Sequence, residues 1–122
     1  MARILVLDDV ADAVKMMKRI LESGGHEVFT FTDEREALDF LSRSRVDLAI
    51  LDIRLKKMSG LVVLETIKKN HPVTRVMMLT GHPTAETLHE SKRLGASEYC
   101  VKPIDTHELE KKVAAVLQGE NV

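Results

Sequence analysis

Five short apolar runs alternate with longer segments of helical periodicity, and this alternation is the strongest constraint on the fold. The apolar runs are Ile4–Leu7, Val28–Phe31, Val46–Leu51, Val76–Thr80 and Tyr99–Val101. Short aliphatic runs of this kind are typical of strands that are buried on both faces of a parallel sheet. Strands that alternate with helices require such a sheet, with helices covering both faces. We therefore expect an α/β protein with a five-stranded parallel sheet, doubly wound as (βα)5, in three layers.

Each intervening segment has a recognisable start or stop signal. The first expected helix runs from about Ala11 to Glu22, with Gly24 as its stop, and the second starts after Thr32 or Asp33. The third follows Gly60 and ends before Pro72, the fourth follows Thr84 and ends at Gly95, and the fifth opens with a capping box of Asp105 and Glu108. Apolar residues at helical spacing are expected to face the core. They are Val14, Met17 and Leu21; Ala37, Leu38 and Leu41; Val63, Leu64 and Ile67; and Leu109, Val113, Val116 and Leu117.

The fourth of these helices has few residues with which to anchor itself. Only Ala85, Leu88 and Leu94 are clearly apolar in it, and the other positions are polar or charged. Weakly anchored elements are those that move at low energetic cost. The segment is therefore either an element that moves in function or an ordinary solvated helix, and the sequence favours neither reading.

Composition limits the classes of function. The 122 residues fit one domain, and 18 Lys and Arg against 19 Asp and Glu give a net charge of -1. That balance lacks the basic excess of a nucleic-acid-binding domain, and no apolar run approaches the ~20 residues that span a bilayer. Cys100 is the only cysteine, so the chain has no intrachain disulfide and a cytoplasmic location is expected. The polar stretch 118–122 is expected to be a C-terminal tail or the start of a linker.

Polar residues follow four of the five predicted strands at the point where each strand ends. They are Asp8 and Asp9, Asp52, Thr80 and Lys102. In an open parallel sheet the ligand crevice lies outside the carboxyl ends of the strands, so these side chains should converge on one edge. Three carboxylates, a hydroxyl and an ammonium suit a divalent cation together with a phosphoryl group.

Asp52 is the candidate nucleophile at this edge. An aspartate can attack phosphorus and form an acyl phosphate, a step that needs charge neutralisation more than proton transfer. Asp8 and Asp9 are the candidate metal ligands, one of them direct and the other through water. The alternative is that one of this pair only caps the first helix, but two adjacent acids beside a third would repel one another without a cation.

Lys102 and Thr80 are the candidate phosphate contacts. Lys102 would pair with a phosphate oxygen, and Thr80 would donate its hydroxyl to another. Their alternatives are a surface lysine and a threonine that caps a turn. Pro103 argues against the first of these, because Lys-Pro after a strand fixes a turn, and some such bonds are cis.

The chain resembles the receiver domain of two-component response regulators over essentially its whole length, residues 1–122. The matching residues are Asp8, Asp9, Asp52, Gly60, Thr80, Tyr99, Lys102 and Pro103. The resemblance implies a flavodoxin-like sandwich in which Asp52 accepts a phosphoryl group from a histidine kinase or phosphotransfer protein. It implies Mg²⁺ held by Asp9, Asp52 and the backbone carbonyl of Arg54, with Asp8 acting through water.

The resemblance also implies a switch. Lys102 and Thr80 would contact the phosphoryl group, and Tyr99 would rotate inward when Thr80 moves. The face formed by the fourth helix, fifth strand and fifth helix would then control an output domain, a partner protein or a second copy of the chain. The first helix, around Val14 to Leu21, would receive the kinase. Such a domain is not an enzyme in the usual sense, although it assists its own phosphorylation and dephosphorylation, and it needs neither nucleic acid nor membrane.

Some positions depart from the family pattern. Lys56 stands where many relatives have proline, which favours a more flexible loop after Asp52, and Ile104 replaces a common phenylalanine. Arg54 and His82 occupy the variable positions that tune the access of hydrolytic water, so the lifetime of the phosphorylated state stays open.

Other functions of an α/β chain fit less well. A dinucleotide-binding domain needs a glycine-rich turn after the first strand, where this chain has Asp8 and Asp9, and a Walker A loop is absent. A phosphatase of the haloacid dehalogenase class needs a second acid at the position of Arg54. A non-phosphorylated interaction domain on the same scaffold is the remaining alternative, but it would be expected to lose acids or the lysine from the edge.

Overall fold

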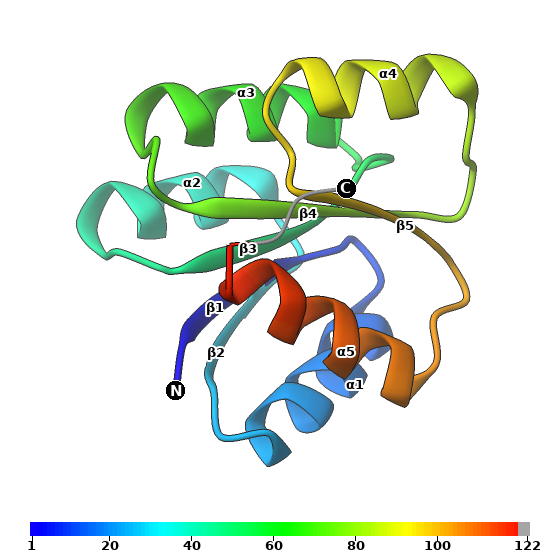
Figure 1. Ribbon diagram of the computed structural model, residues 1–122. Coiled ribbons are helices and arrows are strands. Elements are labelled where there is room, and N and C mark those ends of the chain that lie inside the picture. The colour runs from blue at the N-terminus through cyan, green and yellow to red at the C-terminus, as the bar shows by residue number, and fades with distance from the viewer. Residues whose placement is uncertain (120–122) are drawn as a thin grey trace.

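The computed structural model describes residues 1–119 and confirms the predicted order of strands and helices (Figure 1). The strands are β1 (Arg3–Leu7), β2 (Glu27–Phe31), β3 (Leu48–Asp52), β4 (Arg75–Thr80) and β5 (Glu98–Val101). The helices are α1 (Ala11–Ser23), α2 (Glu34–Arg43), α3 (Gly60–Asn70), α4 (Ala85–Arg93) and α5 (Thr106–Leu117).

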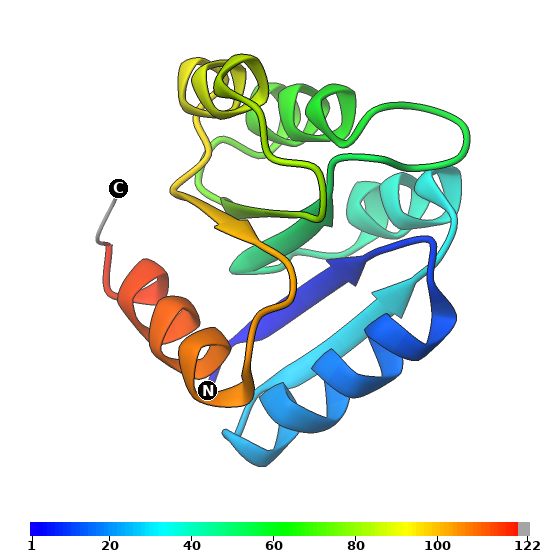
Figure 2. The ribbon, with the colours of Figure 1, turned by 90° about the vertical axis from the view of Figure 1, so that its right-hand side faces the viewer.

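The five strands form one parallel sheet in the order β2-β1-β3-β4-β5. Helices α1 and α5 cover one face, and α2, α3 and α4 cover the other, which gives three layers (Figures 1 and 2). The chain order reverses between β1 and β3, and in doubly wound sheets this switch point is where the ligand crevice opens. The predicted fold class is therefore confirmed.

Strand residues alternate between two hydrophobic cores, one on each face of the sheet. In β1, Ile4 and Val6 join the core beneath α1 and α5, whereas Leu5 and Leu7 join the core beneath α2 and α3. The predicted inward residues of α1, α3 and α5 are buried, apart from the half-buried Leu117. Because both faces are covered, the sheet has no solvent-facing side, which explains the near-continuous apolar runs in the sequence.

Helix starts differ from the sequence prediction in one respect. At α5 the Asp105 side chain accepts a hydrogen bond from Glu108 N at 2.7 Å, but the described residues hold only this half of the predicted capping box. The complete reciprocal box lies at α4, between Thr84 and Thr87. The usual sequence pattern of a capping box has Glu or Gln at the third helical position, so Thr87, with its shorter side chain, does not match it.

Two expectations concern the ends of elements. Helix α4 ends at Arg93, slightly before the predicted stop, and Gly95 follows with φ 99°. The expected tail or linker 118–122 is only partly visible, because residues 120–122 lie outside the described residues. Within residues 1–119, no helix has the length and apolar character needed to cross a membrane.

Candidate functional site

The strand register brings the predicted site residues to one edge of the sheet. Leu7 of β1 lies opposite Leu51 of β3, so the residues that follow them, Asp8 and Asp52, are neighbours. On the other side of β3, Thr80 at the end of β4 lies opposite Val101, and the Lys102 N–H donates to the Thr80 carbonyl at 2.8 Å. Four strand ends thus deliver their polar residues to a common crevice.

Three carboxylates gather in this crevice. Asp8, Asp9 and Asp52 each offer an oxygen atom, and these oxygens lie within 4.8 Å of one another. Asp8 is 1% exposed and Asp52 is 7% exposed, whereas Asp9 is half-buried. Carboxylate oxygens are the preferred ligands of hard divalent cations, and the three acids are close enough to share one ion. The donor set therefore fits Mg²⁺.

Lys102 balances part of the negative charge. Its Nζ donates to Asp8 Oδ2 at 2.6 Å and to Asp52 Oδ2 at 3.2 Å. Burial opposes the ammonium form, but the hydrogen bond to Asp8 and the charges of both acids outweigh it and raise the pKa of Lys102. The Lys102–Pro103 peptide bond is cis. One ammonium among three carboxylates leaves the cluster negative, which a bound divalent cation would offset.

Asp52 also lacks enough nearby positive charge to offset its burial. Burial raises the pKa of its carboxyl group above the usual value, and the nearby Asp8 adds to the rise, although Lys102 opposes both. The backbone N–H of Arg54 also approaches Asp52 Oδ1 at 3.3 Å. A carboxylate that is buried, held by a lysine and beside two further carboxylates is suited to nucleophilic attack on a phosphoryl group.

The backbone that follows Asp52 turns back so that Gly60 lies directly against the backbone of Asp52 and Ile53. The Gly60 N–H donates to the Ile53 carbonyl at 2.7 Å, and Arg54 pairs with Ser59 in an antiparallel bridge. A Cβ atom at Gly60 would lie 2.0 Å from the carbonyl oxygen of Asp52, which no side chain tolerates. This close approach explains why a glycine stands eight residues after Asp52.

Thr80 and Tyr99 lie at the edge but are not hydrogen-bonded to each other among the described residues. Thr80 is buried, and its Oγ1 accepts from His82 N at 3.0 Å, which is the turn-capping role set out above as the alternative. The Tyr99 hydroxyl instead shares a 2.8 Å hydrogen bond with Thr87 Oγ1, inside the capping box of α4. Tyr99 is therefore connected to the start of α4, a contact that the sequence analysis did not predict.

Asp8 also has a local role. Its Oδ1 accepts a hydrogen bond from Val10 N at 3.0 Å, although the start of α1 receives no side-chain cap from it. The helix-capping alternative for the acid pair is thus met only by a turn before the helix. Because Asp8 also contacts Lys102, the local turn and the charge cluster use different oxygens of the same carboxylate.

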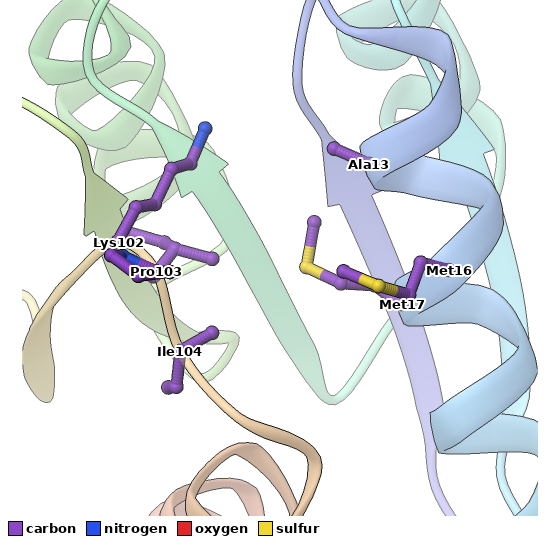
Figure 3. A pocket seen from close by; sticks show the side chains of 7 residues that line it. Ala13, Met16, Met17, Lys102, Pro103 and Ile104 are labelled. Atoms are coloured by element: carbon purple, nitrogen blue, oxygen red, sulfur yellow. The ribbon is translucent and has the colours of Figure 1, made fainter.

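The kinase-docking face expected on the first helix, around Val14 to Leu21, stays a prediction, and the structure shows which residues of that range are buried. Val14, Met17 and Leu21 are buried beneath α1, because the apolar stripe of a surface helix packs against the sheet. An open apolar groove of about 410 Å³ lies beside this stripe, between α1 and the segment after β5 (Figure 3). It is lined by Ala13, Met16, Met17, Leu79, Lys102, Pro103 and Ile104.

Sequence reasoning missed Glu34, the first residue of α2. The side chain is buried, and it accepts hydrogen bonds from two backbone amides of the segment between β3 and α3. The signal was present, because Glu34 is three and seven residues before Ala37 and Leu41 and so shares their inward helix face. An acid in a first helical turn is typically solvated, so its residue type gives no sign of this contact.

Comparisons with known proteins agree with this geometry. The family described as "Response regulator receiver domain" matches residues 4–114. The chain is 34% identical over 116 residues to regulatory protein VanR of Enterococcus faecium, covering 95% of this chain and 50% of VanR. It is 33% identical over 118 residues to transcriptional regulatory protein CpxR of Escherichia coli K12, covering 97% and 50% respectively.

A solved structure gives the same result at the level of the fold. The CheY-like receiver domain protein from Methanospirillum hungatei JF-1 is 32% identical and superposes with a TM-score of 0.94, covering 97% of this chain and 94% of that one. The chain spans about half the length of the two curated relatives. It therefore belongs to the receiver domains of two-component response regulators, a family whose general function is phosphorylation-activated switching.

Proposed function

We propose that Asp52 is the phosphoryl acceptor of this domain and that the acceptor reaction uses Mg²⁺. The observation that carries the proposal is the Lys102 ammonium between Asp8 and Asp52, with Asp9 beside them. An Asp52 oxygen would attack the phosphorus of a phosphohistidine, so that a P–O bond forms while the P–N bond breaks and imidazole leaves. The bound cation would neutralise charge on the transferring phosphoryl group.

The residues of the edge divide this work. Asp9, Asp52 and the backbone carbonyl of Arg54 would hold the cation, with Asp8 acting through water, as the family resemblance implies. Lys102 would turn from the carboxylates to a phosphate oxygen, and the Thr80 hydroxyl would donate to another. The domain is then a switch that assists its own phosphorylation and dephosphorylation, not an enzyme that turns over a separate substrate.

The energetics allow such a switch within limits. A charge-assisted hydrogen bond contributes about 1.5–3 kcal/mol. Inverting a population from 1:99 to 99:1 takes about 5.5 kcal/mol. Two new bonds, from Lys102 and Thr80, are therefore just sufficient if the two states lie close in energy. We expect α4, Tyr99 and the face shared with α5 to respond, and this face to control an output domain, a partner protein or a second copy.

The donor of the phosphoryl group would be a histidine kinase or a phosphotransfer protein in the cytoplasm. The groove beside Met16 and Ile104 borders Lys102, so an apolar helix seated there would bring a phosphohistidine toward Asp52. This groove lies within the contact expected on the first helix around Val14 to Leu21 and narrows it to the side of the exposed Met16. It is open and almost entirely apolar in its side chains, which suits a transient protein contact.

Phosphorylation by a small donor tests the acceptor assignment. Incubation with Mg²⁺ and acetyl phosphate should add one hydroxylamine-labile phosphoryl group, seen as a single mass increment, and Asp52→Asn should abolish it. Asp39→Asn is the matched control, because Asp39 is an exposed helical aspartate whose carboxylate pairs, within residues 1–119, only with Arg43. Normal modification of Asp52→Asn at any other residue would overturn the assignment.

Beryllofluoride tests the switch separately from the acceptor chemistry. As a phosphate mimic, it should change backbone amide shifts along α4, around Tyr99 and on the α5 face. Shifts confined to the loops around Asp9, Asp52 and Lys102 would mean that the domain accepts phosphate without switching.

A further inference from the structure

The segment between β3 and α3, residues 53–59, is held from outside by one buried carboxylate. Glu34 Oε2 accepts hydrogen bonds from Lys57 N at 2.6 Å and from Met58 N at 2.9 Å. Glu34 belongs to α2 and is 1% exposed, although glutamate is among the residues least often buried. A buried carboxylate needs hydrogen bonds to offset its lost hydration, and here two backbone amides supply them.

Helix α2 does not itself require this inward glutamate. Its N-cap is Asp33, whose Oδ2 accepts from Glu36 N at 3.0 Å, and the exposed Glu36 already places a negative charge in the first turn. The Lys57 ammonium pairs with Asp33 at 2.6 Å, not with Glu34. The Glu34 carboxylate is thus committed to the backbone of the segment and has no charged partner among the described residues.

The contacts restrain different parts of segment 53–59. Its base is closed by the Gly60 N–H bond to the Ile53 carbonyl and by the bridge between Arg54 and Ser59. Its tip donates two hydrogen bonds to Glu34, from the backbone amides of the two residues directly after Lys56. The flexibility expected from Lys56 in place of proline is therefore opposed by a restraint that comes from a different βα unit.

We infer that Glu34 is a positioning residue for the metal site, because it fixes the segment that contains Arg54. The inference rests on the proposed function, in which the Arg54 backbone carbonyl and Asp52 hold Mg²⁺. Glu34 touches neither the cation nor the phosphoryl group. It acts through the backbone of Lys57 and Met58, so that the segment is already ordered when the cation arrives.

Four variants of the whole chain separate this role from general stability. Glu34→Ala removes the acceptor, and Glu34→Gln keeps an acceptor oxygen of the same shape without the charge. Glu36→Gln removes a charge from the same helical turn without touching segment 53–59. Asp33→Asn removes the ion pair with Lys57 and keeps a good N-cap residue.

Two measurements on the folded protein give the result. Without metal, the amides of Lys57 and Met58 should exchange about tenfold faster or more in Glu34→Ala, and less so in Glu34→Gln. The Mg²⁺ dissociation constant should rise roughly three- to tenfold in Glu34→Ala, which is less than the 10–100-fold loss typical of a residue bonded directly to a metal ligand. Both controls should keep wild-type values, with melting curves confirming that each variant is folded.

The outcomes distinguish this inference from the proposed function. Wild-type Mg²⁺ affinity in both Glu34 variants would overturn the inference while leaving Asp52 as the acceptor. A change in melting temperature with unchanged Mg²⁺ affinity would do the same, since it would show a purely structural role. Failure of the wild-type domain to bind Mg²⁺ would instead overturn the proposed function, and with it the metal-positioning role.

Discussion

The segment after β3 and helix α4 flank the same edge of the sheet, yet they are held in opposite ways. Segment 53–59 is short and irregular, but it packs Ile53 into the core, is closed at its base through Gly60 and is held at its tip by the buried Glu34. Helix α4 is a regular element, but Ser91 is its only buried residue. Regular secondary structure is therefore no guide to rigidity here, because hydrogen bonds to buried groups and packed side chains decide it.

The contrast suits a domain that must keep its chemistry in place while its surface changes. The first turn of α4 is joined to β5 through the hydroxyls of Thr87 and Tyr99, and the Ser91 hydroxyl is 0% exposed with no hydrogen-bond partner in the described chain. An unsatisfied buried hydroxyl weakens the packing that it joins. Four changes test this division, from the largest expected effect to the smallest.

Replacing Gly60 by alanine should disrupt the rigidly held segment 53–59. The added Cβ would lie 2.0 Å from the Asp52 carbonyl oxygen, so the backbone that carries Asp52 must shift. We expect a loss of roughly 3 kcal/mol or more in the free energy of unfolding, together with loss of phosphorylation. Chemical denaturation measures the first effect. Gly24→Ala is the control and should change stability by less than ~1 kcal/mol, because its φ is -84° and its nearest contact is 3.4 Å.

Removing the hydroxyls of Tyr99 and Thr87 should loosen the attachment of α4. Tyr99→Phe and Thr87→Val each delete one partner of the 2.8 Å hydrogen bond, and a coupling of about 0.5–1.5 kcal/mol is expected between them in a double-mutant cycle. Amide exchange should accelerate in the first turn of α4 and stay unchanged at Lys57 and Met58. Strict additivity of the two substitutions would show that this bond does not hold α4.

Ser91→Ala should stabilise the protein by strengthening the packing of α4. It removes the unpartnered buried hydroxyl and improves helix propensity, so we expect a gain of about 1 kcal/mol in the free energy of unfolding. Ser42→Ala in α2 is the control for a serine with a partner, because its exposed hydroxyl donates to the Asp39 carbonyl at 2.6 Å, and it should stabilise less than Ser91→Ala. A more firmly packed α4 should also respond less to beryllofluoride. Destabilisation by Ser91→Ala would mean that the hydroxyl has a partner in solution.

Removing the charge of Asp52 should produce the smallest effect on stability, and this effect should depend on pH. The pKa of Asp52 is raised by burial and by Asp8, so the folded state binds its proton more tightly than the unfolded state does. Stability from this group is present below the usual aspartate pKa and is lost as the pH rises through the raised value. Asp52→Asn should therefore raise the melting temperature at neutral pH, with the gain fading in acid. An equal gain in melting temperature at all pH values would show that charge is not the cause. Added Mg²⁺ should stabilise only the wild type, so that the wild type then melts at a higher temperature than Asp52→Asn.

Much of the architecture could be predicted from the sequence because strand and helix signals are local. The apolar run before Asp52 and the helical spacing of Val63, Leu64 and Ile67 each mark a buried element without knowledge of its neighbours. The rule that ligands gather at the carboxyl ends of parallel strands then placed Asp8 and Lys102 together, although they are 94 positions apart.

The contacts that the sequence did not reveal join side chains to distant partners. Glu34 bonds to backbone amides 23 and 24 positions away, and any residue offers a backbone amide, so no residue type at the other end signals the contact. Thr87 and Tyr99 depend on how α4 settles against β5. Helix α1 packs Val14 into the core, as its apolar spacing predicts, and leaves Met16 exposed beside the groove.

The sheet separates the proposed binding site of the phosphoryl donor from the proposed binding site of the output partner. The groove at Met16 and Ile104 lies on the side of the sheet that α1 and α5 cover, whereas α4, which contains Thr87 and Ser91, lies on the opposite side (Figures 2 and 3). A kinase or phosphotransfer protein bound in the groove and an output partner bound to α4 would approach from different directions and would not compete for space. The output partner could then bind before the phosphoryl donor dissociates, so that both proteins occupy one receiver domain at the same time.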